Sequence, residues 1–401
     1  MTVSGRAQQA IRGTPDITAG GVAPAAGPGT GPGSATRLPT SLAELETPAP
    51  IVDLDRLAVN LDRAAAYAAS HRLALRPHVK THKSPMIARE QIDRGAVGLT
   101  CATVREIEVM ADVTDDLLFA YPPVGAPRIR RLLAAPRHVR LIVSLDSEAA
   151  IDALADAAAT ADRVVRVYVE IDVGMRRVGV TSADHAVALA RRVTRRAELE
   201  YAGIAFYAGH IREPVTDQDA RLARLDADLR TVLGTLADAD LAPAAVSGGS
   251  TPTLWRSHEL TGLTEIRPGT YVFNDRTTAQ LGASALTDCA LTVLATVVST
   301  AVAGQAVIDA GAKALGREPL QDSDAQGFGA VADHPEVVVT RMSEEHGILD
   351  LRDTSWRPSV GELVRIIPNH VCIVVHLNDV VFGVRGDRVE TSWPVAARGR
   401  V

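Results

Sequence analysis

Lysine is scarce in this sequence, and the few lysines present are the side chains best suited to amine chemistry. Lys and Arg together number 42, and Lys occurs only at positions 80, 83 and 313, so 42 − 3 leaves 39 arginines. A guanidinium keeps its proton and does not form an imine. Positions that retain a lysine are therefore candidates for covalent chemistry at a carbonyl group. Two of the three lie close together, in segment 76–83, which reads Arg-Pro-His-Val-Lys-Thr-His-Lys.

A second segment has the composition of a phosphate-binding loop. Residues 247–251 read Ser-Gly-Gly-Ser-Thr, and they offer hydroxyls and backbone N–H donors to an anion without Mg²⁺. An ordinary strand-to-helix turn is the alternative interpretation of these five residues alone. A lysine that faces such a loop indicates a phosphorylated aldehyde held as an imine, namely pyridoxal 5′-phosphate (PLP).

A third pattern, His370-Val371-Cys372, has the residue types of a metal site. In a strand, residues i and i+2 point to the same face, so the imidazole and the thiolate would meet one ion. Nitrogen and sulfur ligands favour Zn²⁺, with Mn²⁺ or Mg²⁺ as alternatives. Two protein ligands leave open positions, which a Lewis-acid role requires. The alternative is a packed thiol beside a surface imidazole.

The elements that must position these groups alternate along the chain. Short runs rich in Val, Ile and Leu are separated by stretches of helical period, which is typical of a βα series. Eight parallel strands indicate a closed eight-stranded α/β (TIM-type) barrel, with an open sheet as the alternative. We expect strands at 73–80, 97–101, 116–121, 139–145, 164–172, 199–207, 244–247 and 263–273, and helices at 85–94, 104–111, 128–134, 149–158, 184–195 and 219–236.

The barrel would bring the candidate groups together. Its active site lies at the carboxyl ends of the strands, and the loops after strands seven and eight often bind phosphate. On that rule one rim carries Lys80, Arg177, Tyr207, residues 247–251, Tyr271 and Asp275.

The chain divides into four parts. Residues 1–40 are predicted to be a disordered leader, because Gly, Pro, Ala, Ser and Thr predominate there without apolar periodicity. Residues 41–54 carry a strand that joins the second domain, and residues 55–280 form the PLP-binding barrel. Residues 281–401 form a C-terminal antiparallel β domain with the metal-site residues, because Val-, Thr- and Ile-rich runs, including 371–377, predominate there.

Composition excludes several function classes. The net charge of −6 gives no basic surface for nucleic acid or an anionic membrane. Three cysteines argue against a disulfide scaffold and for a reducing compartment. No apolar run is long enough to span a bilayer, and residues 1–20 lack the features of a signal peptide. We therefore expect a cytoplasmic protein.

With these motifs the sequence resembles the D-threonine aldolase and D-serine dehydratase-like family, PLP enzymes of the alanine racemase fold. The resemblance covers roughly Pro50 to Val384. It is carried by segment 76–83, Cys101-Ala102-Thr103, Asp172-x-Gly174 with Arg177, Tyr207, and segments 247–251, 267–271, 309–313, 344–347 and 368–372.

The resemblance implies roles for these residues. Lys80 would form the imine with PLP, with Lys83 as a supporting or surface charge and His82 as a second catalytic candidate. Arg177 would lie near the phenolic oxygen of PLP, and Tyr207 would hydrogen-bond its pyridine nitrogen. His370 and Cys372 would hold a divalent ion against the β-hydroxyl of the substrate. The full set of cofactor-binding candidates is Lys80, Arg177, Tyr207, Ser247, Gly248, Gly249, Ser250, Thr251, Tyr271 and Asp275.

The resemblance implies a lyase acting on β-hydroxy D-amino acids, and two reactions share this apparatus. Elimination of water and ammonia, as in D-serine dehydratase, is favoured because Cys372 resembles the sulfur ligand of the zinc-dependent dehydratases. Retro-aldol cleavage to glycine and an aldehyde is the alternative, although Glu213 stands where aldolases tend to carry an imidazole, with His210 nearer Tyr207. An amino-acid racemase and a non-catalytic PLP-binding protein are further alternatives. Racemase-like folds usually form homodimers, and the resemblance implies one here.

Overall fold

The computed structural model describes residues 38–320 and 326–399. The predicted disordered leader, residues 1–40, falls almost entirely outside the described residues.

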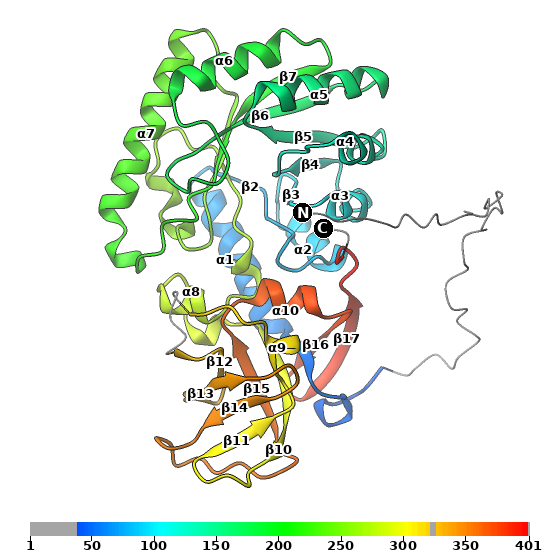
Figure 1. Cartoon of the computed structure of the whole chain (residues 1–401), viewed down its shortest axis with the longest axis vertical. Coiled ribbons are helices and arrows are strands. Elements are labelled where there is room, and N and C mark those ends of the chain that lie inside the picture. The colour runs from blue at the N-terminus through cyan, green and yellow to red at the C-terminus, as the bar shows by residue number, and fades with distance from the viewer. Residues whose placement is uncertain (1–37, 321–325, 400–401) are drawn as a thin grey trace, which may run out of the picture. The chain divides into compact units, whose positions relative to one another are not determined.

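The first domain is a parallel β-barrel surrounded by helices (Figure 1). The strand order is β2-β9-β8-β7-β6-β5-β4-β3. An isolated parallel bridge between His78 and Thr100 joins the two ends of this order and closes the barrel. Its strands are β2 (Ala74–Leu75), β3 (Leu99–Cys101), β4 (Asp116–Phe119), β5 (Arg140–Leu145), β6 (Val165–Ile171), β7 (Leu199–Phe206), β8 (Ala245–Gly248) and β9 (Glu265–Ile266).

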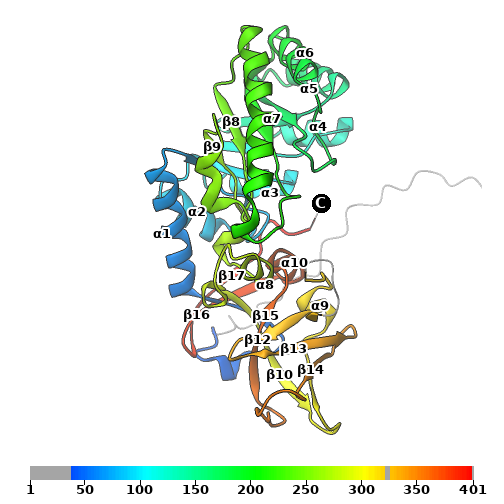
Figure 2. The ribbon, with the colours of Figure 1, turned by 90° about the vertical axis from the view of Figure 1, so that its left-hand side faces the viewer.

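The barrel helices lie outside the strands and bury one face each. In α7, the buried residues Leu222, Leu225, Leu229 and Leu236 recur at helical spacing, so one apolar stripe packs inward. Figure 2 shows α7 running along the outside of the strands. The helices are α1 (Leu54–Ser70), α2 (Pro85–Asp93), α3 (Val104–Met110), α4 (Ala126–Leu133), α5 (Glu148–Thr160), α6 (Ala183–Thr194), α7 (Asp219–Asp238) and α8 (Arg276–Gln280), with 3₁₀ helices η2 (Val215–Asp217), η3 (Leu254–Glu259) and η4 (Thr270–Val272).

Two predicted barrel strands are much shorter than expected. The strand predicted at 73–80 ends at Leu75, and Lys80 lies in a turn after it, because Pro77 has no N–H for the ladder. The strand predicted at 263–273 ends at Ile266, where Pro268 and Gly269 follow, and residues 270–272 form η4.

The second domain is a mixed sheet, mainly antiparallel, built around the N-terminal strand β1 (Ala49–Asp53). Its order is β11-β14-β13-β12-β15-β10-β1-β16-β17, with a further pairing of β10 and β11. Strand β1 is antiparallel to β10 and parallel to β16. The other elements are η1 (Leu42–Glu44), η5 (Leu286–Asp288), β10 (Leu291–Ser299), β11 (Gln305–Ile308), α9 (Ala312–Leu315), β12 (Gly329–Val331), β13 (His334–Met342), β14 (Gly347–Asp350), β15 (Leu363–Pro368), α10 (Val371–Leu377), β16 (Val380–Arg385) and β17 (Arg388–Pro394). The predicted α/β barrel with a C-terminal β domain is confirmed.

Segment 371–377, which was predicted as a strand, is the helix α10 instead. Its buried residues are Val371, Val374 and Val375, a spacing of three and four residues that suits a helix. A short β-branched run is ambiguous from sequence because a buried helix and a buried strand are both apolar. His370 is therefore the N-cap of a helix, and Cys372 lies in its first turn.

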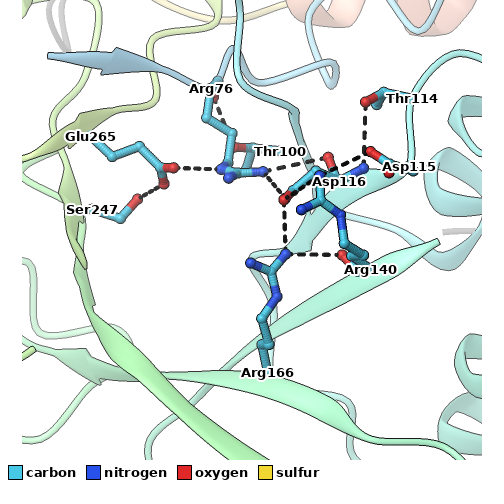
Figure 3. Close-up of polar contacts among 9 residues, drawn as sticks. All are labelled: Arg76, Thr100, Thr114, Asp115, Asp116, Arg140, Arg166, Ser247 and Glu265. Carbon is cyan, nitrogen blue, oxygen red and sulfur yellow. Dashed lines mark hydrogen bonds and ion pairs between the residues drawn. The ribbon is translucent and has the colours of Figure 1, made fainter. Parts of the chain in front are cut away.

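A buried ionic cluster occupies the barrel interior near the amino ends of β4 and β9 (Figure 3). Arg76 donates to Glu265 Oε2 at 2.7 Å and to Asp116 Oδ1 at 2.6 Å. Arg166 donates to Asp116 at 2.9 Å, and the Ser247 hydroxyl donates to Glu265 at 2.5 Å. Every charge of this cluster therefore has an opposite partner, as burial requires.

No helix among the described residues is long and apolar enough to cross a membrane.

Candidate active site

A cavity lies at the carboxyl ends of the barrel strands. It holds about 740 Å³ of empty space, its mouth included, which is in the usual range for a small-molecule site. Six predicted rim residues line it, together with groups that the sequence analysis did not assign as cofactor contacts. The wall includes Lys80, Arg177, Tyr207, Gly249, Ser250 and Thr251, together with His78, Ser144, Glu170, Arg267 and Thr270.

Lys80 is held in this wall by its neighbours in the turn after β2. Its backbone N–H donates to His78 Nδ1 at 3.3 Å, and the His78 N–H donates to the Pro268 carbonyl at 3.0 Å. Burial and the neighbouring Lys80 charge lower the pKa of His78 well below its ordinary value. A neutral His78 can accept the Lys80 N–H, so it fixes the turn from which the amine projects.

The aromatic ring of Tyr207 lies close to two cations. Lys80 Nζ is 5.6 Å from the ring centroid, and Arg177 Cζ is 5.0 Å from it. Both distances are within the range of a cation–π interaction. The amine, the guanidinium and the phenol therefore face a common volume, as the rim prediction required.

The two glycines at the end of β8 let the backbone form part of the cavity wall. A Cβ added to Gly248 would lie 2.2 Å from Phe206 Cζ, and Gly249 has a φ of +86°. Only glycine fits the first position without displacing a ring, and glycine suits the second conformation. Gly249, Ser250 and Thr251 line the cavity, whereas Gly248 packs behind it.

Three buried polar residues in the wall were not predicted from the sequence as cofactor contacts. They are Ser144, Glu170 and Arg267. The Ser144 hydroxyl donates to the Glu170 carboxylate. Arg267 is 8% exposed and donates from Nη2 to the Phe206 carbonyl at 2.7 Å, but its Nε has no partner among the described residues. Ser144 and Glu170 are inward positions of ordinary-looking strands, which sequence patterns do not distinguish from core.

Besides Gly248, four predicted cofactor or catalytic residues do not line the cavity. Ser247 is buried and bonds Glu265 in the ionic cluster, and the Tyr271 hydroxyl accepts from Gln91 at 2.9 Å. Asp275 is fully buried and contacts His370 rather than the cavity. His82 is 1% exposed, and its Nδ1 accepts from the Ser84 N–H at 3.1 Å. These residues lie outside the described cavity wall, so their assignment to cofactor or catalytic contact stays a prediction.

Lys83 is held away from the cavity. It is 5% exposed and forms a buried ion pair with Glu106. The second oxygen of Glu106 accepts the Ala102 N–H at 2.6 Å. Lys83 is therefore a supporting charge rather than a surface charge, and Lys80 is the lysine that reaches the cavity.

The burial of His82 predicts a pH-dependent loss of stability. Burial lowers the pKa of His82 to about 4, whereas an unfolded His titrates near 6.5. Because the unfolded state then binds more protons, stability falls as pH falls from about 6.5 towards 4. We expect the unfolding free energy of the wild type to drop about 2 kcal/mol more than that of His82→Asn between pH 7 and pH 4.5. Urea titrations at both pH values measure this difference, and equal pH dependence of the two proteins would contradict it.

Comparisons with known proteins agree with this geometry. The family model of the alanine racemase N-terminal domain matches residues 52–277, and that of the putative serine dehydratase domain matches residues 290–384. A D-threo-3-hydroxyaspartate dehydratase from Delftia sp. (strain HT23) is 36% identical over 352 residues, which is 83% of this chain and 92% of that protein. The chain belongs to the D-threonine aldolase and D-serine dehydratase-like family.

Solved structures of this family have the same fold. The crystal structure of D-threonine aldolase from Filomicrobium marinum is 35% identical with a TM-score of 0.84, covering 92% of this chain and 100% of that one. A cysteine-to-alanine mutant of a D-threo-3-hydroxyaspartate dehydratase, solved in a metal-free form, is 31% identical with a TM-score of 0.79, covering 88% and 98%. The named relatives are dehydratases and aldolases, so the chain is a lyase, and the family implies PLP as its cofactor.

The residues present fit the cofactor of the D-serine dehydratase-like family. The cavity wall offers one lysine amine, together with Gly249, Ser250 and Thr251 of the glycine loop. It also holds a buried guanidinium N–H, Arg267 Nε, that has no hydrogen-bond partner within residues 38–320 and 326–399. An amine, an anion cradle and an unsatisfied donor are the groups that a phosphorylated, oxygen-rich aldehyde would need.

The second pair predicted by the family, His370 and Cys372, lies beside this wall. Cys372 Sγ is 3.3 Å from the hydroxyl of Thr81, the residue that follows Lys80. The negative Cys372 and a hydrogen bond that the His370 ring donates to Asp275 raise the pKa of His370, although burial opposes them. Burial would raise the pKa of Cys372, but the charge of His370 and a hydrogen bond between the two side chains lower it. No group of three or more His, Cys, Asp or Glu side chains with metal-site geometry occurs in residues 38–320 and 326–399.

Proposed function

We propose that this protein is a PLP- and zinc-dependent lyase that eliminates water and ammonia from a β-hydroxy D-amino acid. The observation that carries the proposal is the position of the Lys80 amine. Lys80 lines the same cavity as the glycine loop, and the adjacent residue, Thr81, contacts Cys372. An amine, an anion cradle and a His–Cys pair are the parts that such an elimination requires.

The residues that would hold PLP divide between the two sides of the cavity. Gly249, Ser250 and Thr251 would hold the phosphate through backbone and hydroxyl donors, and Arg177 and Tyr207 would contact the ring. When bound, PLP withdraws electrons from the α-carbon of the substrate and so makes its proton acidic. Lys80 Nζ would take that proton, because its amine lines the cavity and arginine cannot act as a base there.

His370 and Cys372 would hold a zinc ion near the β-hydroxyl. Zn²⁺ would supply Lewis acidity that stabilises charge on the departing oxygen. Imidazole nitrogen and thiolate sulfur are ligands that zinc accepts, and two protein ligands leave positions open for substrate and water.

Retro-aldol cleavage is the second candidate, supported by the similarity to D-threonine aldolase. That reaction needs a base at the β-hydroxyl. Glu213 is instead bonded to Arg221 at 2.7 Å, and neither Glu213 nor His210 is part of the described cavity wall. This arrangement favours elimination.

The test separates the two reactions by their products. The purified protein is incubated with D-serine, D-threonine and D-3-hydroxyaspartate, and the products are quantified. We expect an oxo acid and ammonia in equal amounts. Glycine with an aldehyde would establish the aldolase instead, the mirror-image amino acid would indicate a racemase, and no consumption of any substrate would indicate a non-catalytic PLP-binding protein.

Metal removal should abolish most of the elimination. After dialysis against a chelator, we expect the rate of oxo acid release to fall by about 10²-fold or more, because one preorganised stabiliser of developing charge is lost. Added Zn²⁺ should restore it in the wild type but not in His370→Ala. A rate unaffected by chelation would contradict the zinc role.

We also propose a homodimer in a reducing, cytoplasmic environment. Cys101, Cys289 and Cys372 are all free thiols in the structure, which suits such a compartment. Sedimentation equilibrium gives the mass of the assembly, and a monomeric mass at micromolar concentration would contradict the dimer.

A further inference from the structure

Asp275 lies behind the His–Cys pair and links the two domains. Its carboxylate is fully buried. One oxygen, Oδ1, accepts the Thr278 N–H at 2.9 Å and so caps α8. The other oxygen, Oδ2, lies 3.1 Å from His370 Nδ1 and accepts the Val371 N–H at 3.2 Å. One side chain of the barrel domain therefore holds both the His370 ring and the start of α10.

The peptide that carries His370 is gripped by further contacts from α8. Arg276 donates to the Asn369 side-chain oxygen at 2.7 Å, and the Thr277 hydroxyl donates to the Asn369 carbonyl at 2.8 Å. The Asn369 amide donates to the carbonyls of Glu318 and Gly327 at 3.0 and 2.9 Å. With the backbone fixed in this way, the remaining freedom of His370 is the rotation and the tautomer of its ring.

The geometry points to Asp275 as a positioning residue that sets the tautomer and orientation of His370 for zinc. This inference rests on the proposed zinc site. With the Nδ1–H donated to the Asp275 carboxylate, the lone pair of the ring belongs to Nε2. The His370 side chain is 38% exposed, whereas Asp275 is enclosed. The ring turns Nδ1 to the carboxylate and also hydrogen-bonds Cys372, the proposed second ligand. A carboxylate behind a ligating imidazole fixes the ring and makes it a stronger base.

The test measures zinc affinity rather than turnover. Full-length wild type and variants are stripped of metal and titrated with Zn²⁺ against a chromophoric chelator of known affinity. We expect Asp275→Asn to weaken zinc binding by about 10- to 100-fold, the usual effect of losing such a partner. The asparagine amide has only one acceptor oxygen, which can accept from the α8 cap or from the His370 side of the site, but not from both. The amide also carries no negative charge.

Two further variants separate positioning from folding. Thr278→Val removes the reciprocal contact of the α8 cap, in which the Thr278 hydroxyl accepts the Asp275 N–H at 2.9 Å, and it leaves the carboxylate in place. We expect its zinc affinity to stay within about twofold of wild type. Asp275→Ser keeps an N-cap oxygen for α8 but is too short to reach His370, and it should lose zinc affinity as Asp275→Asn does. PLP bound per chain should be unchanged in all three variants.

The outcomes distinguish this inference from the function on which it rests. If His370→Ala and Cys372→Ala bind zinc as the wild type does, the zinc site itself is refuted and the role of Asp275 falls with it. If both lose zinc while Asp275→Asn and Asp275→Ser stay within twofold of Thr278→Val, the zinc site stands and the positioning role is overturned. Equal losses in Thr278→Val and Asp275→Asn would assign the effect to the helix cap and would also overturn it.

Discussion

Lys80→Ala should lose about 10⁴-fold of the lyase rate, because the amine that would take the α-proton would also form the bond to the cofactor. The variant should also lose the visible absorbance of the protein–PLP complex. Reduction of the wild type with borohydride, followed by peptide mapping, should place the PLP adduct on Lys80.

Because the chain has only three lysines, an adduct found by peptide mapping can be assigned to one position. The chain offers two other lysines as internal controls, and both are engaged elsewhere. Lys83 is buried against Glu106, and Lys313 pairs with Glu344 and Glu345 outside the cavity wall. Lys313→Ala should therefore keep the wild-type rate and spectrum. An adduct on either of these lysines, or activity retained by Lys80→Ala, would refute the site.

Arg76→Met should lower the free energy of unfolding more than Arg166→Met or the loss of any other single partner in the ionic cluster of Figure 3. Arg76 lies between Asp116 and Glu265, and all three side chains are at most 7% exposed. Removing the cation leaves Glu265 without a cationic partner in the described structure, which costs about 3–5 kcal/mol. That is a large share of the roughly 5–15 kcal/mol by which domains are stable. Urea denaturation followed by circular dichroism measures the change.

Two companion variants test the physical reason. Arg76→Met combined with Glu265→Gln should recover part of the loss, because no unpaired buried charge remains. Arg166→Met removes a cation that is 25% exposed and leaves Asp116 paired with Arg76, so it should cost about 1 kcal/mol or less. A double variant no more stable than Arg76→Met alone would show that shape, rather than charge, accounts for the loss.

The barrel could be predicted because its signal repeats along the chain. Buried parallel strands read as apolar runs, and amphipathic helices separate them, so errors at single boundaries do not change the topology. Apart from the long helix α1, the errors fall where an element is short. Pro77 and Pro268 cut two strands to two residues each, and the valines of α10 give no contrast between faces over seven residues. Helix α1 was missed, although Leu57, Leu61, Ala64 and Ala68 are buried at helical spacing.

The site could be predicted only as far as topology determines it. Lys80 follows β2 and the glycine loop follows β8, the first and seventh strands of the barrel. The barrel topology alone therefore brings both to the same rim. The local backbone conformation after each strand sets the direction in which a side chain points from the rim. Tyr271 lies in η4 and turns to Gln91, and Asp275 caps α8 and turns to His370. Glu170 could not be predicted as a cavity residue. A single carboxylate in a strand does not show in the sequence whether it faces the barrel interior, because its spatial neighbours come from other strands.

The place of β1 in the second sheet has a consequence for how the chain is made. Ile51 leaves the ribosome early, yet it pairs with Thr292 and Phe382, which are translated more than two hundred and more than three hundred residues later. The nascent barrel must therefore carry an apolar strand at its amino end that has no partner until β10 is made, and its second edge stays unpaired until β16 is made late in synthesis. A fragment that stops after α8 would keep Ile51 and Val52 in water, and aggregation through that exposed edge is the expected fate of prematurely terminated chains.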